Sequence, residues 1–338
     1  MTRPLFQPAA KQQARARVGF SGPSGSGKTM WSLQWATVLA KGGKVAVIDT
    51  ERGSASLYAD NYGFDVLQMT PPFHPDRLVE ALAAATEAGY AVVIIDSLTH
   101  FWSGAGGVLE IVDEASSRFK GNSHAAWQVG TPIQQRMVDA ILGFEGHIVA
   151  TMRAKTEWVM EQGNGGKTTP RKVGLAPQQR ADIEFEFTLF MELDHLHRAS
   201  VSKTRFDQFA DKVFNPEESE RTASQFADWL EQGAARVKSS ERDALRQKIA
   251  DMPEKSRTVL KVRWKESGLP NLDRLNVDQM AKVDEMILAA LVEADPFTPA
   301  RKTARKAQIV EYTTEVVKDL LAPETIEEAL GDALEEAF

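Results

Sequence analysis

After a short apolar run at residues 18–21, the sequence continues as Gly22-Pro23-Ser24-Gly25-Ser26-Gly27-Lys28-Thr29. This stretch matches the phosphate-loop pattern of a glycine, four residues, Gly-Lys and then Ser or Thr. The apolar run predicts a strand before the loop, and the helical spacing of residues 29–40 predicts a helix after it. Backbone N–H groups of such a loop, together with the helix N-terminus, attract phosphate. The pattern therefore predicts a nucleoside triphosphate site rather than a plain glycine-rich turn.

Two polar residues of the loop and one acidic residue further along predict a Mg²⁺ ion beside the triphosphate. Lys28 is expected to reach the β- and γ-phosphates, and the Thr29 hydroxyl to ligate the metal. Residues 92–97 are Val-Val-Ile-Ile-Asp-Ser, so Asp96 ends an apolar strand. A carboxylate in that position is the usual second contact on the metal side of a phosphate loop.

Hydrolysis also needs a carboxylate that orients the attacking water. In many phosphate-loop ATPases a glutamate directly follows the strand-ending aspartate, but here Asp96 is followed by Ser97. We therefore expect the base to come from Glu51, at the end of the strand predicted over residues 44–49. The alternative is that Glu51 is a solvated glutamate in a turn.

The order of predicted elements favours an α/β fold with a mainly parallel central sheet. Strands are predicted over residues 18–21, 44–49, 64–69, 90–96 and 147–152, and helices over residues 29–40, 75–88 and 132–142. Residues 103–131 and 154–181 are expected to be irregular, and residues 184–192 and 199–203 to form a hairpin. We divide the chain into an N-terminal arm (1–16), the nucleotide-binding core (17–235), a three-helix module (236–294) and a partly disordered or helical tail (295–338).

Composition limits the environment of the chain. The 338 residues include no cysteine, which excludes disulfides, cysteine-ligated zinc and a cysteine nucleophile. A signal-peptide pattern and a membrane-length apolar run are both lacking, so we expect a cytoplasmic protein with no membrane partner. The net charge of −7 means that any DNA contact must come from local basic patches. His195 and His197, in the turn of the predicted hairpin, lack metal-ligand spacing and are expected to be solvated.

Glu51 after the second predicted strand, and Asp96-Ser97 at the end of a later one, resemble the arrangement in the RecA-like ATPases. Over residues 16–232 the chain looks most like phage-encoded AAA-family, RecA-core proteins of recombination and single-strand annealing. That resemblance implies a location in the bacterial host cytoplasm. Residues 148–155 are similar to the strand that leads into a DNA-binding loop in RecA, with Arg153 and Lys155 as its Arg-x-Lys pair. Thr151 stands where RecA has a sensor glutamine, so the resemblance does not extend to that contact.

The resemblance also implies roles for two further groups of basic residues. Lys203 and Arg205 are similar to the basic pair that RecA-like oligomers, rings or filaments, project into a neighbouring subunit's ATP; the alternative is a pair of solvated cations ending a strand. The basic loop over residues 154–181 would contact single-stranded DNA; the alternative is a surface insertion. The candidate DNA contacts are Arg153, Lys155, Trp158, Lys167, Arg171 and Lys172.

The sequence thus predicts an oligomeric, DNA-dependent ATPase that acts on single-stranded DNA in recombination, annealing or repair. A hexameric helicase or translocase would share every core residue. A third function compatible with the motifs is an ATP-gated switch or scaffold without DNA activity, and a fourth is a small-molecule kinase. In the helical module, Arg257, Lys261 and Lys265 predict a basic helix face, which we expect to be solvated; the alternative is a small module that binds DNA or a partner. We expect the acidic tail to be a frayed amphipathic helix, and the alternative is a segment that binds a protein partner.

Overall fold

The computed structural model describes residues 11–162, 168–235, 237 and 239–294. The chain divides into two compact units, Met1–Gly233 and Ala234–Phe338. The larger unit contains the phosphate loop, and the smaller contains the helices predicted near the C-terminus.

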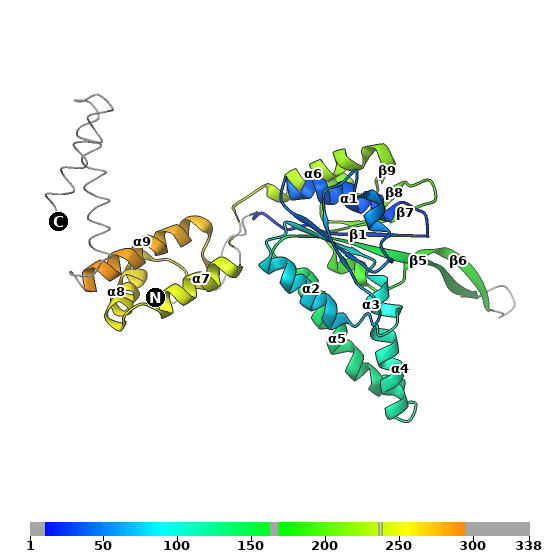
Figure 1. The fold of residues 1–338 in the computed structure, drawn as a ribbon, viewed down its shortest axis with the longest axis horizontal. Helices are drawn as coiled ribbons and strands as arrows, with labels where there is room; N and C mark the ends of the chain where they lie inside the picture. The colour runs from blue at the N-terminus through cyan, green and yellow to red at the C-terminus, as the bar shows by residue number, and fades with distance from the viewer. Residues whose placement is uncertain (1–10, 163–167, 236, 238, 295–338) are drawn as a thin grey trace. The chain divides into compact units, whose positions relative to one another are not determined.

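A nine-stranded sheet forms the centre of the larger unit (Figure 1). Its strands are β1 (Arg17–Gly22), β2 (Val45–Asp49), β3 (Asp65–Gln68), β4 (Val92–Asp96), β5 (His147–Gln162), β6 (Thr168–Pro177), β7 (Leu189–Leu193), β8 (Ala199–Thr204) and β9 (Val213–Phe214). They follow the order β3-β2-β4-β5-β1-β7-β8-β9, with β6 paired to β5 outside that path. Neighbours from β3 to β7 run parallel, whereas β6, β8 and β9 pair antiparallel.

Helices cover both faces of this sheet. They are α1 (Lys28–Ala40), α2 (Pro75–Glu87), α3 (Thr99–Ser103), α4 (Val108–Arg118), α5 (Ser123–Gly143) and α6 (Ser219–Glu231). Figure 1 shows α1 and α6 on one face and α2 and α5 on the other. The predicted α/β class with a mainly parallel sheet is confirmed.

Strand β4 shows why the sheet needs helices on both sides. All of its residues are buried, and successive side chains of a strand point to opposite faces. Val92 and Ile94 join the core under α1 and α6, while Val93 and Ile95 join the core under α2 and α5. An uninterrupted apolar run is therefore what this position requires.

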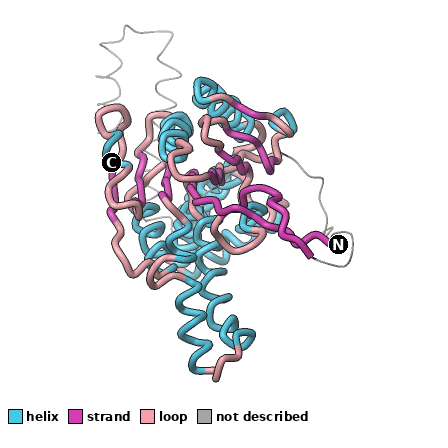
Figure 2. Tube along the Cα trace, turned by 90° about the vertical axis from the view of Figure 1, so that its right-hand side faces the viewer, coloured by secondary structure: helices cyan, strands magenta, loops and turns pink. Residues whose placement is uncertain are grey.

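The sequence predicts an irregular segment over residues 103–131, and that prediction is wrong. The structure has α4 there, and α5 begins at Ser123 and runs through Pro132. The Asn122 side chain caps α5 by accepting the backbone N–H of Ala125 at 3.1 Å. At Gly130 a Cβ would overlap the side chain of Val112, so glycine permits the close approach of α4 to α5. Both helices extend beyond the sheet in Figure 2.

The predicted loop over residues 154–181 is also corrected. Most of it is an antiparallel hairpin in which β5 continues past the sheet and pairs with β6, from Ala154↔Pro177 to Gln162↔Thr168. Backbone ladder bonds, which need no particular side chains, stabilise this pairing despite its Gly, Lys and Pro content. The hairpin predicted downstream is confirmed, although β7 begins only at Leu189, because residues Ile183–Glu186 form a 3₁₀ turn.

The smaller unit contains α7 (Ser239–Ala250), α8 (Glu254–Ser267) and α9 (Val277–Ala294), so the predicted small helical module is confirmed. Its core includes Leu245, Leu260 and Ile287. The basic face predicted on α8 is exposed, at Arg257, Lys261 and Lys265. The predicted tail, residues 295–338, lies outside the described residues, as does most of the N-terminal arm.

Among the helices that the structure describes, none combines the length and the apolar character that crossing a membrane requires.

Candidate functional site

The phosphate loop lies between β1 and α1, with its backbone shaped by glycines. Gly25 and Gly27 have φ of 75° and 87°, in the left-handed region that favours glycine. The Lys28 ammonium donates to the carbonyls of Gly22 and Pro23, at 3.0 and 2.8 Å. Burial lowers the pKa of Lys28, while the nearby carboxylates act in the opposite direction. The lysine is thus held at the loop, where a phosphate would meet it.

The two predicted metal ligands lie side by side. Thr29 Oγ1 donates to Asp96 Oδ2 at 2.7 Å, and Thr151 Oγ1 donates to Asp96 Oδ1 at 2.5 Å. Burial raises the pKa of Asp96, and the two hydroxyl hydrogen bonds oppose that rise. A hydroxyl and a carboxylate oxygen, adjacent to a phosphate loop, are hard oxygen donors of the kind that suits Mg²⁺. The Thr151 hydroxyl therefore orients Asp96.

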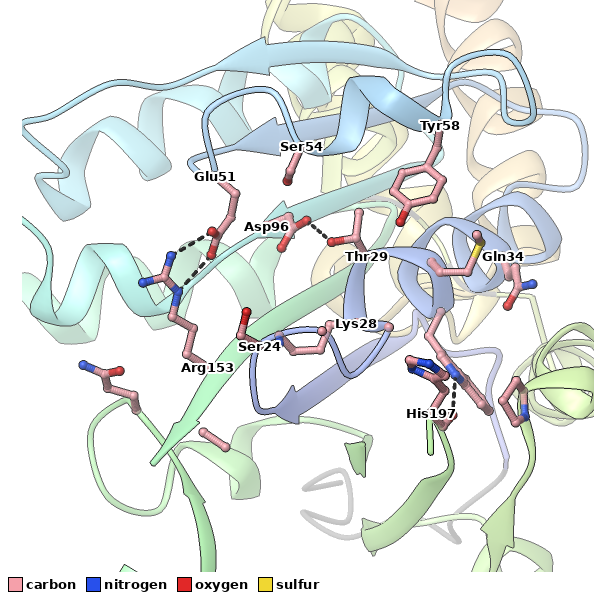
Figure 3. Close-up of a pocket in the computed structure, with 17 residues that line it drawn as sticks. Ser24, Lys28, Thr29, Gln34, Glu51, Ser54, Tyr58, Asp96, Arg153 and His197 are labelled. Atoms are coloured by element: carbon pink, nitrogen blue, oxygen red, sulfur yellow. Dashed lines mark hydrogen bonds and ion pairs between the residues drawn. The ribbon is translucent and has the colours of Figure 1, made fainter. Parts of the chain in front are cut away.

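Glu51 lies in the turn after β2, and Asp49 fixes that turn. Asp49 Oδ1 accepts the backbone N–H of Glu51 at 2.6 Å, and Oδ2 accepts that of Ala55 at 3.3 Å. The Glu51 side chain points into the same cavity as Lys28 and Asp96 (Figure 3). The turn thus places the Glu51 carboxylate in the cavity beside the phosphate loop.

Arg153 forms a two-point ion pair with Glu51. Its Nε donates to Oε1 at 3.1 Å and its Nη2 donates to Oε2 at 2.7 Å. Burial would raise the pKa of Glu51, but the hydrogen bonds and the charge of Arg153 outweigh it and hold that pKa below its usual value. The sequence predicts a DNA contact for Arg153, and in the structure Arg153 lines the same cavity as Lys28 and Glu51.

Thr50, Ser97 and His100 form a second group of polar residues beside the turn after β2. Thr50 Oγ1 accepts the backbone N–H of Ser97 at 2.8 Å and lies 2.7 Å from His100 Nδ1. The His100 ring stacks on Phe73, with 5.1 Å between ring centroids. Burial lowers the pKa of His100, which favours the neutral ring. The strand ends of β2 and β4 are therefore tied to each other beside the site.

The cavity has a volume of about 890 Å³. Its lining includes the polar or charged residues Lys28, Thr29, Glu51, Asp96, Arg153 and Gln178. The same lining also includes Met30, Trp31, Gln34, Tyr58, His197 and Pro216. Figure 3 shows Glu51 and Arg153 on one side of Lys28, and Gln34, Tyr58 and His197 on the other. Charged groups that suit phosphates and aromatic groups that suit a base thus share one cavity.

His197 belongs to this cavity, although its position in a hairpin turn predicts only a solvated residue. It lies in the β7–β8 turn, and its carbonyl accepts the indole N–H of Trp31 at 3.1 Å. The contact joins residues 166 positions apart. Only the packing of β7 beside β1 brings that turn to α1, so the sequence carries no local sign of it.

The predicted finger residues lie outside the cavity lining. The Lys203 ammonium donates to the carbonyl of Phe185 at 3.1 Å and also to that of Phe187. Burial and the neighbouring charge of Arg205 lower the pKa of Lys203. Arg205 is exposed. The Lys203 ammonium is therefore hydrogen-bonded to backbone carbonyls, whereas Arg205 faces solvent.

The remaining predicted DNA contacts lie along the hairpin. Lys155 is exposed at its base. The strand register pairs Trp158 with Lys172, and Val159 with Arg171. Lys167 lies outside the described residues. The structure thus brings Trp158, Arg171 and Lys172 to one part of the β5–β6 ladder.

The chain is similar to one protein family and to a solved structure. Residues 14–264 match a family described as AAA domain. A crystal structure of the RadB recombinase is similar to the chain at 17% identity and a TM-score of 0.33, over 57% of this chain and 84% of that one. At that TM-score, the similarity adds nothing to what the strand order shows. A search of curated proteins found no match.

Proposed function

The chain belongs to the AAA domain family, which its match over residues 14–264 shows, and from that premise we propose that it hydrolyses ATP with Mg²⁺. One observation carries the proposal. The hydroxyl of Thr29 bonds the carboxylate of Asp96 at 2.7 Å inside the cavity that also contains Lys28 and Glu51. A binding-only site has no need of a second carboxylate aimed at the same space.

In this proposal each residue of the cavity has a role that fits its position. The loop and Lys28 bind the β- and γ-phosphates, and Thr29 and Asp96 hold the metal. Bound Mg²⁺ would neutralise charge on those phosphates. Glu51 accepts a proton from the attacking water, whose oxygen bonds to the γ-phosphorus while the bond to the bridging oxygen breaks. The products are ADP and inorganic phosphate.

We infer that the site is completed by a second copy of the chain in a ring or filament. Arg205 is exposed and lies outside the lining of its own cavity, which fits a residue that acts on a neighbour. An arginine aimed at the γ-phosphate stabilises charge that develops during transfer. Lys203, whose ammonium already donates to two backbone carbonyls, lies on β8, and Arg205 follows directly after the last residue of that strand.

The proposed effector is single-stranded DNA, in recombination, annealing or repair, and the proposed source of the protein is a phage. Support comes from the β5–β6 hairpin, which carries Lys155, Trp158, Arg171 and Lys172 on an element that extends from the sheet (Figure 1). Cations that follow phosphates and a ring that stacks on bases suit an unpaired strand.

The test is ATP turnover with and without single-stranded DNA, with molar mass measured in parallel. We expect DNA to stimulate turnover, and we expect Lys28→Ala and chelation of Mg²⁺ to abolish it. Turnover that DNA leaves unchanged, with no gel shift at low salt, would contradict the DNA proposal. Strand displacement on forked DNA would indicate a helicase, and turnover indifferent to Glu51→Gln would indicate a switch or scaffold.

A further inference from the structure

The position of Arg153 joins three parts of the site. It lies on β5 in register with Gly22, the first residue of the phosphate loop, on the adjacent strand β1. Its backbone is fixed, because its N–H donates to Thr99 Oγ1 at 2.9 Å and its carbonyl accepts the Gln178 N–H at 2.6 Å. Any change of partner must therefore be a movement of the side chain.

The present partner of that side chain is the proposed base. Arg153 contacts both carboxylate oxygens of Glu51, at 3.1 and 2.7 Å. A carboxylate engaged at both oxygens is poorly placed to accept a proton from water. The pairing uses Nε and Nη2 of the guanidinium, and Nη1 is not part of it.

The pair is also accessible enough to be exchanged. The Arg153 side chain is 48% exposed and that of Glu51 25% exposed. Ion pairs that retain solvent contact stabilise weakly, whereas an arginine binds a phosphate group through several charge-assisted hydrogen bonds. Arg153 and Lys28 line the same cavity, so a terminal phosphate held by Lys28 would compete with Glu51 for the guanidinium (Figure 3).

We propose that Arg153 is a γ-phosphate ligand supplied by the same chain, which moves from Glu51 to the terminal phosphate when a triphosphate binds. The movement frees Glu51 to accept the proton of the attacking water as the oxygen–phosphorus bond forms and the bond to the bridging oxygen breaks. With a diphosphate bound, Arg153 stays on Glu51 and the base stays engaged. The inference rests on the proposed ATP hydrolysis and assigns Arg153 a role distinct from that of Arg205.

The test compares binding of a non-hydrolysable ATP analogue and of ADP by calorimetry, on the full chain. Arg153→Ala should weaken analogue binding about tenfold and change ADP binding less than about twofold. Arg153→Lys, which keeps the charge but not the two-point geometry, should fall between. Arg136→Ala is the matched control, since it removes another exposed arginine–carboxylate pair, with Asp76 at 2.9 Å, outside the cavity.

A second set of variants separates phosphate binding from simple positioning of Glu51. Glu51→Gln removes the competing charge, so it should strengthen analogue binding several-fold, and the gain should vanish in the Glu51→Gln, Arg153→Ala double variant. If the analogue-to-ADP preference stays unchanged in Arg153→Ala, Arg153 only positions Glu51 and the proposal is overturned. A wild-type chain without turnover would contradict the proposed function, yet these binding ratios would still decide the role of Arg153.

Discussion

The buried carboxylate of Asp49 accepts the backbone N–H of Glu51 at 2.6 Å, so the last residue of β2 holds the turn that carries the proposed base. The same carboxylate also accepts the N–H of Ala55. Asp49 is 1% exposed, so water is not available to replace either bond.

Asp49→Ala should therefore weaken both stability and catalysis. Unpaired N–H groups at this site should lower the free energy of unfolding by about 1–3 kcal/mol. Displacement of Glu51 should reduce turnover at least about tenfold, and ATP affinity should stay within about twofold. Denaturant titration, single-turnover rates and calorimetry measure these effects. Asp49→Asn keeps one acceptor oxygen and should be milder; equal turnover in Asp49→Ala and wild type would contradict the positioning role.

Thr151→Val should raise the Mg²⁺ concentration that half-maximal turnover requires. The Thr151 hydroxyl bonds Asp96 Oδ1 at 2.5 Å, and that bond opposes the rise in the pKa of Asp96 that burial causes. Without it, protons compete more strongly with the metal for Asp96, so the requirement should increase further as pH falls. A Mg²⁺ titration at several pH values measures this effect. Thr151→Ser keeps the hydroxyl and should resemble wild type, and an unchanged requirement in Thr151→Val would rule out the assigned role.

Substitution of Lys203 should lower stability, whereas substitution of Arg205 should lower turnover. Lys203→Met removes the ammonium that donates to Phe185 and Phe187, and should lower the free energy of unfolding by about 1 kcal/mol. Arg205→Ala should leave ATP affinity and stability unchanged but abolish turnover.

Mixing inactive variants tests whether Arg205 acts on a neighbour. Lys28→Ala subunits would supply an intact Arg205 to the sites of Arg205→Ala subunits, so the mixture should regain turnover that neither variant has alone. Arg205→Ala with normal turnover would show that the finger assignment is wrong.

His147 should contribute an acid-sensitive part of the stability. Its Nδ1 accepts the N–H of Ala16 at 3.0 Å, and burial together with nearby cations lowers its pKa to about 3. The unfolded chain has the ordinary histidine pKa of about 6.5 and so binds a proton that the folded chain does not. As pH falls from about 6.5 towards 3, this residue should reduce stability by up to about 1.4 kcal/mol per pH unit.

The His147→Gln variant provides the check, because an amide oxygen can accept the same N–H without titrating. Denaturant titrations between about pH 7 and pH 5 should show a shallower decline for the variant than for wild type. Identical slopes would assign the acid sensitivity to other groups.

Prediction from the sequence succeeds where the signal is local. The apolar runs that end at Gly22, Asp49 and Asp96 indicate buried strands, and parallel strands bring their carboxyl ends to one edge of a sheet. The hydrogen bond between Thr29 and Asp96 at 2.7 Å follows from that arrangement. Their catalytic roles remain proposals.

Prediction fails where a contact joins distant positions. The partner of Glu51 is 102 residues away, and only the neighbouring register of β1 and β5 brings Arg153 to the loop. In the sequence, the position of Arg153 next to a basic segment predicts a contact with nucleic acid. Its charge alone does not distinguish the phosphates of DNA from those of a nucleotide. The β5–β6 hairpin is missed because pairing between backbones leaves little trace in a sequence rich in Gly, Lys and Pro.

The indole of Trp31 is 1% exposed, lines the cavity and donates to the carbonyl of His197. Indole emission responds to the polarity and hydrogen bonding of its surroundings, and a nucleotide in this cavity would alter both. The chain therefore contains its own optical reporter, and nucleotide occupancy can be followed by intrinsic fluorescence without any attached dye. Trp31→Phe would identify the part of the signal that comes from the site, apart from the other tryptophans of the chain.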